Sequence, residues 1–73
     1  MKISEGQTQK ILSGAVQCKF NQLGFNMLIS RMERAYRSDS TSTVLAQCTQ
    51  EINNFLAKYE KIMGKDYALI AQI

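Results

Sequence analysis

The sequence predicts an all-α protein, a single domain over residues 1–73 that folds as an antiparallel hairpin of two long helices. Three observations support this fold class: apolar residues recur at helical spacing, one polar segment divides the chain, and proline is absent. The apolar repeat of the second half comprises Leu45, Cys48, Ile52, Phe55, Tyr59, Ile62, Leu69 and Ile73, with Asp66 as the one interruption. Spacings of three and four residues keep such a stripe on one side of a helix, as in a coiled coil.

The first helix is expected to begin near residue 5 and to continue to about Arg37. Ser4 and Gln7 match the S-x-x-Q capping box, in which both side chains pair with backbone N–H groups that the helix leaves free. A kink or break at Gly24 is the alternative to a continuous helix.

The turn of the hairpin is predicted at residues 38–43, which contain only Ser, Thr and Asp. Their side chains also favour the N-terminal cap of a second helix beginning near Thr43. The heptad spacing continues across Gly64, from Ile62 to Leu69, and this favours one continuous helix. A break at Gly64, followed by a separate terminal helix, is the alternative.

A turn centred near residue 40 sets the register, so residues that pack across the hairpin have numbers that sum to about 80. The expected pairs are Tyr36 with Leu45, Met32 with Cys48, Ile29 with Ile52, Phe25 with Phe55, Cys18 with Ile62, and Ile11 with Leu69. This register separates Cys18 from Cys48 by more than the reach of a disulfide. Both cysteines are therefore expected to be free thiols that pack as small apolar residues.

The first helix carries a second apolar stripe, which a single partner helix cannot cover. Together with an edge of the second helix, this stripe forms the predicted assembly surface, which comprises Leu12, Val16, Phe20, Leu23, Met27, Leu56, Met63 and Ile70. Such a surface is buried by a second copy, by a different protein, or by a bend that folds the chain back on itself. Assembly of copies into a helical bundle is the leading expectation.

Two clusters of basic side chains are the candidate contacts for an anionic partner. They are Arg31, Arg34 and Arg37 before the turn, and Lys58, Lys61 and Lys65 on the second helix. Arginine presents a planar fork that suits carboxylate and phosphate groups, and the net charge of +3 favours an anionic partner. The competing interpretation is a solvated helix surface that nearby glutamates partly neutralise.

The composition gives little support for catalysis, metal binding or a cofactor. Histidine is absent, no Gly-rich phosphate loop occurs, and the six acidic residues are scattered along the chain. We therefore expect no catalytic residues, no metal site and no cofactor. The N-terminus lacks the apolar region of a signal peptide, and the apolar runs are too short to span a bilayer, so a cytoplasmic location without membrane contact is expected.

The leading functional hypothesis is a small, basic, non-enzymatic protein-interaction module that self-associates and binds a macromolecular partner as a regulator, inhibitor or adaptor. The first alternative is a nucleic-acid-binding hairpin dimer with its Arg and Lys clusters on phosphates, similar in general character to small plasmid copy-number regulators. The second alternative is a structural protomer of a helical assembly or secretion apparatus. The predicted hairpin length and the apolar ending of residues 69–73 resemble the needle subunits of type III secretion, although the proline-bearing turn of that family is missing.

Overall fold

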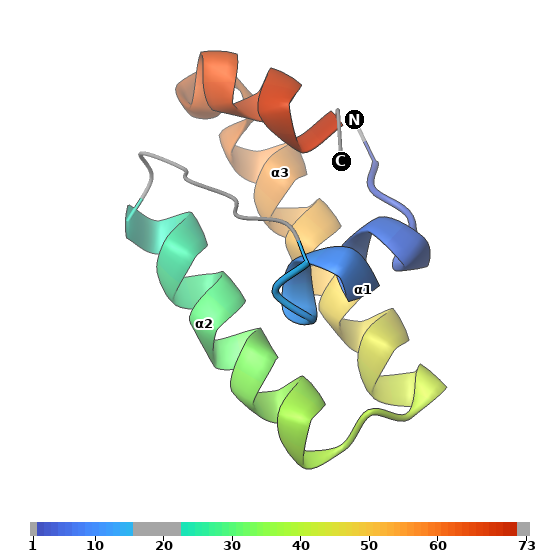
Figure 1. Ribbon diagram of the computed structural model, residues 1–73. Helices are drawn as coiled ribbons and strands as arrows, with labels where there is room; N and C mark the ends of the chain where they lie inside the picture. The colour runs from blue at the N-terminus through green and yellow to red at the C-terminus, as the bar shows by residue number, and fades with distance from the viewer. Residues whose placement is uncertain (1, 16–22, 72–73) are drawn as a thin grey trace.

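Helices make up most of the computed structural model, which describes residues 2–15 and 23–71 except for the side chains of residues 63, 65–69 and 71 (Figure 1). Helix α1 spans Glu5–Leu12, α2 spans Leu23–Ser38, and α3 spans Ser42–Ala71. The predicted all-α class is confirmed, because the described residues contain no strand. The two-helix hairpin is corrected to three helices within the described residues.

The predicted cap of the first helix is confirmed. The Gln7 backbone N–H donates to the Ser4 side chain at 3.2 Å, and the Ser4 backbone N–H donates to the Gln7 side chain at 2.7 Å. These reciprocal bonds pair two backbone donors that the first helical turn would otherwise leave free. The N-terminal boundary of α1 is therefore fixed by residues close together in the sequence.

The predicted continuity of the first helix from residue 5 to Arg37 is wrong, because α1 ends at Leu12. The backbone N–H of Ser13 closes the last turn on the Gln9 carbonyl at 2.9 Å. Gly14 then adopts a φ of +73°, a left-handed conformation that glycine tolerates and that ends helices. The alternative of a break in this helix is correct, but the break begins after Leu12, and Gly24 itself lies in the first turn of α2, which starts at Leu23.

The turn between α2 and α3 and the register that follows from it agree with the prediction. The Asp39 side chain accepts from the Thr41 N–H at 3.2 Å, and the Thr41 hydroxyl accepts from the Val44 N–H at 3.4 Å. Across the two helices the rings of Phe25 and Phe55 lie 5.5 Å apart, nearly edge to face. A local turn therefore sets the pairing of two long helices.

Helix α1 packs on α3 through paired polar groups. The Thr49 hydroxyl donates to the Thr8 oxygen at 2.8 Å, and the side-chain amide of Asn53 bonds both backbone groups of Ile3, accepting from its N–H at 2.8 Å and donating to its carbonyl at 3.1 Å. We call these four residues the α1–α3 seam. It places residues 3–8 antiparallel to residues 49–53, in a different register from that between α2 and α3.

The C-terminal part of α3 bends away from the rest of that helix (Figure 1). Backbone angles leave the helical range at Tyr59, with φ −116° and ψ 18°, and at Gly64, with φ 45° and ψ −113°. The expected continuity across Gly64 is wrong and the alternative of a break there is correct, because this positive φ is open mainly to glycine. The bend also explains why Ile62 is 63% exposed although the heptad predicts it to be buried.

All three helices contribute to one apolar core, with some of its side chains taken from the predicted assembly surface. The core comprises Ile3, Ile11, Leu12, Phe25, Ile29, Met32, Cys48, Ile52, Leu56 and Ile70. Leu12, Leu56 and Ile70 were predicted to face a second copy, yet they are at most 4% exposed within the single chain. The predicted assembly surface could be buried by a second copy, by a different protein or by a bend of the chain. The bend of the chain accounts for the burial of these three residues. The predicted pairs Cys18–Ile62 and Ile11–Leu69 each include a side chain outside the described residues.

The α1–α3 seam can be tested by changing Asn53 to Ala. This substitution removes both bonds to Ile3 and leaves partly buried backbone groups unpaired, so we expect the free energy of unfolding to fall by about 1 to 3 kcal/mol. Asn54, an exposed neighbour, is the matched control, and Asn54→Ala should change stability by less than about 0.5 kcal/mol. Urea titration followed by circular dichroism measures both values. Equal effects of the two variants would show that the seam does not stabilise α1.

Candidate interaction surface

Helix α2 exposes a row of side chains nearly opposite to those that it buries. Phe25, Ile29 and Met32 face the core at helical spacing. The opposite row runs along the helix as Leu23, Met27, Ser30 and Arg34. In this row Leu23 is 75% exposed and Met27 is 65% exposed, so the row is apolar at its N-terminal end and cationic at its C-terminal end.

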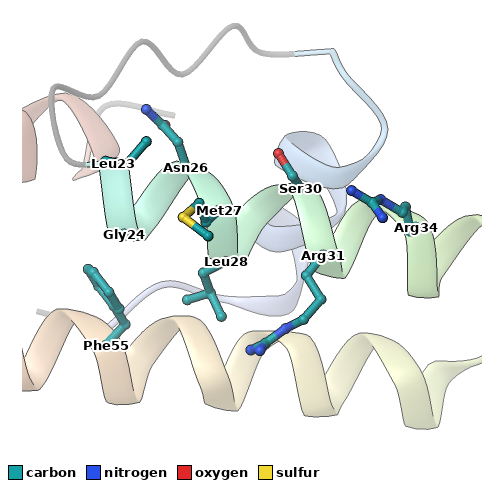
Figure 2. A pocket seen from close by; sticks show the side chains of 9 residues that line it. All are labelled: Leu23, Gly24, Asn26, Met27, Leu28, Ser30, Arg31, Arg34 and Phe55. Atoms are coloured by element: carbon teal, nitrogen blue, oxygen red, sulfur yellow. The ribbon is translucent and has the colours of Figure 1, made fainter.

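This row borders an open hollow of about 820 Å³ beside α2 and α3 (Figure 2). Its lining residues are Leu23, Gly24, Asn26, Met27, Leu28, Ser30, Arg31, Arg34 and Phe55. In Figure 2, Leu28 and Arg31 point from α2 toward α3, while Phe55 points from α3 toward α2. Gly24 has no side chain to cover the Phe55 ring, and a Cβ placed there would lie 3.7 Å from the ring.

A second, smaller hollow continues the first along α3. It is lined by Leu28, Arg31, Glu51, Asn54, Phe55, Lys58 and Tyr59, of which Leu28, Arg31 and Phe55 also line the larger hollow. We call the two together the α2–α3 groove. The Phe55 and Tyr59 rings pack with centroids 4.6 Å apart and, with Leu28, give the groove an apolar floor.

The smaller hollow of the groove brings together one member of each predicted basic cluster, Arg31 and Lys58. Arg31 lies 3.5 Å from the Glu51 carboxylate, and because both side chains are more than half exposed, the ion pair is worth less than about 1 kcal/mol. The Lys58 ammonium lies 5.2 Å from the centroid of the Tyr59 ring. Arg34 lines the groove without an ion pair among the described residues.

The remaining predicted site residues lie elsewhere. Arg37 is exposed at the end of α2 and Lys61 is exposed on α3, but neither lines the groove. Of the predicted assembly surface, the structure keeps Leu23 and Met27 together at the groove and places Leu12, Leu56 and Ile70 in the core. Val16, Phe20, Met63 and Lys65 fall on residues or side chains outside the described part.

The sequence analysis did not identify Leu28, Phe55 and Tyr59 as parts of a surface. Phe55 and Tyr59 follow the heptad and were assigned to the interior, and Leu28 belonged to neither stripe of the first helix. Gly24, one turn before Leu28, was the available signal, because a helix position without a side chain leaves the facing residue uncovered. The floor of the groove therefore became visible only in the fold.

Candidate metal ligands and a thiol group occur among the described residues. No three Cys, Asp or Glu side chains of the described part lie close enough to hold a metal ion. Cys48 is free and buried, and its burial, followed by the negative charge of Glu51, raises the pKa of its thiol. A raised pKa keeps the thiol protonated near neutral pH, so this side chain is a poor nucleophile.

Comparison with protein-family models, with curated proteins and with solved structures found no match to this chain. Within the residues described, none of the helices is both long and apolar enough to cross a bilayer. The α2–α3 groove and its residues are therefore the feature from which a function can be inferred.

The state of Cys48 can be tested in a Cys18→Ser variant, which leaves one thiol to measure. At pH 8 the folded protein should react with a thiol reagent at least about tenfold more slowly than the urea-unfolded chain, because reaction requires opening of the core. The pKa of the Cys48 thiol in the folded protein lies above its ordinary value of 9.0. The protonated thiol therefore makes its whole contribution to the free energy of unfolding below that pH, and this contribution is lost as the pH rises through the folded pKa. Equal reaction rates for folded and unfolded protein would contradict burial of Cys48.

Proposed function

We propose that this protein is a small, non-enzymatic interaction module that binds macromolecular partners through the α2–α3 groove. The observation that carries the proposal is the exposure of Leu23 and Met27 side by side on the groove, whereas ten other apolar side chains of the described residues form the core. Exposed apolar neighbours with a polar rim are typical of a protein-binding surface. A regulator, inhibitor or adaptor would act in this way, by occupying a surface on its partner.

A second copy of the chain is one partner of this surface. In a two-fold symmetric pair that packs Met27 against its counterpart, each Leu23 lies beside Ser30 of the other copy, and the two Arg34 side chains lie at opposite ends of the contact. This arrangement covers the exposed apolar pair without placing the arginines together. The resulting dimer is the helical bundle expected from the sequence, with Leu23 and Met27 as the described members of the predicted assembly surface that take part.

A nucleic-acid partner is the second candidate, favoured by the approach of Arg31 and Lys58 to one hollow. The aromatic rings of the groove are less suited to this role, since Phe55 and Tyr59 are partly buried and pack on each other. The hypothesis of a structural protomer of a helical assembly is weakened, because the resemblance of this chain to needle subunits depended on a two-helix hairpin. The cytoplasmic location stays a prediction.

Self-association can be tested by light scattering during gel filtration. The unmodified chain should show a concentration-dependent dimer, and Met27→Glu should shift it to monomer, because the contact would bury two uncompensated carboxylates. Gln50→Glu makes the same change in charge at an exposed position of α3 outside the groove and should leave the dimer intact. A strict monomer at high concentration, or equal behaviour of both variants, would contradict assembly through Met27.

A further inference from the structure

We propose that the α2–α3 groove is a docking site for an acidic amphipathic helix of another protein. The inference rests on the proposed interaction module and deepens it by naming the chemistry of the partner. Three features of the groove support this docking site: its shape, the order of its side chains and the balance of its charges.

The apolar contacts of the groove have the spacing that a helix can match. Leu23 and Met27 are separated by one helical turn, about 6 Å along α2, and Leu28 and Phe55 continue the apolar contact toward α3. An amphipathic helix presents apolar anchors at i, i+4 and i+7 with the same repeat. The hollow is open and follows α2, with Phe55 of α3 at its edge, and such an open surface suits a helical segment better than a compact small molecule.

The charge of the groove selects an acidic segment. Among the described residues, three cationic side chains, those of Arg31, Arg34 and Lys58, line it together with one carboxylate, that of Glu51. Glu51 is engaged with Arg31, so Arg34 and Lys58 have no carboxylate partner among the described residues. Carboxylates that flank the apolar anchors of a docked helix would pair with these two cations, and bidentate pairing with Arg34 would fix the register of the helix.

A second copy of this chain is a less favourable partner for the charges of the groove than an acidic helix is. The chain carries a net charge of +3, so two copies repel each other at long range, whereas an acidic segment is attracted. An acidic helix and a second copy would both use Leu23 and Met27, and therefore compete. Binding of the acidic helix should dissociate any homodimer formed through this surface.

The test uses a fluorescent, synthetic amphipathic peptide of about 18 residues with leucines at i, i+4 and i+7 and glutamates beside them. Its control is the same peptide with glutamine in place of glutamate. Fluorescence anisotropy should show binding of the acidic peptide at least about tenfold tighter than the control at low salt, with the difference falling as salt is added. Arg34→Glu should weaken the acidic peptide about tenfold or more, because it reverses a charge inside the groove.

Arg37→Glu is the matched variant, since it reverses an exposed arginine on the same helix outside the groove. It should change the affinity less than about threefold, as expected for a charge at the edge of the contact. Circular dichroism verifies that both variants keep the helical fold. Equal binding of the two peptides, or equal effects of Arg34→Glu and Arg37→Glu, would overturn the proposal.

Two further outcomes separate this inference from the proposed function. If a single-stranded RNA oligomer binds more tightly than the acidic peptide and Arg37→Glu weakens it as strongly as Arg34→Glu, phosphate recognition replaces the acidic helix. If the acidic peptide does not bind but Met27→Glu still dissociates a homodimer, the inference of an acidic helix fails and the proposed function as an interaction module is retained. A monomer that binds none of these probes would contradict both.

Discussion

The constraint on which this fold depends is the pairing of polar groups between α1 and α3. Thr8 has no exposed surface, and a hydroxyl at such a position must have hydrogen-bond partners inside the protein. It finds them in the Thr49 hydroxyl and the Ser4 carbonyl, at 2.8 and 3.0 Å. Asn53 adds two bonds to Ile3, so a shift of α1 along α3 would leave several polar groups unpaired.

This docking determines which surface stays open. Once α1 lies on α3, the N-terminal segment contributes Ile3 to the core, α1 contributes Ile11 and Leu12, and one side of the long helix is covered. The outer row of α2 receives no cover from the described residues, and Leu23 and Met27 stay exposed there. The proposed interaction surface thus contains two apolar side chains that the described helices leave exposed, whereas Ile62, which is exposed beyond the bend in α3, lies outside it.

Local features of the fold could be predicted from the sequence, and features that depend on tertiary contacts could not. The Ser4 cap, the turn at residues 38–43 and the pairing of Phe25 with Phe55 follow from residues near one another or from a short turn. The end of α1 was missed because helical periodicity continues across Ser13 and Gly14. Of the residues that line the groove, Met27 and Arg34 were predicted from the sequence to lie on an interaction surface. Leu28 and Phe55, which form its floor, were not predicted, because their exposure to solvent depends on how α2 packs against α3.

The most direct test of this account is an NMR measurement of contacts between Thr8 and the rest of the chain. A mixture of isotope-labelled and unlabelled protein separates contacts within one chain from those between copies. The account predicts nuclear Overhauser effects between the Thr8 and Thr49 methyl groups within one chain, together with effects between Ile3 and the Asn53 side-chain amide. Contacts of Thr8 with the C-terminal end of the chain and none with Thr49, as a simple two-helix hairpin requires, would contradict it.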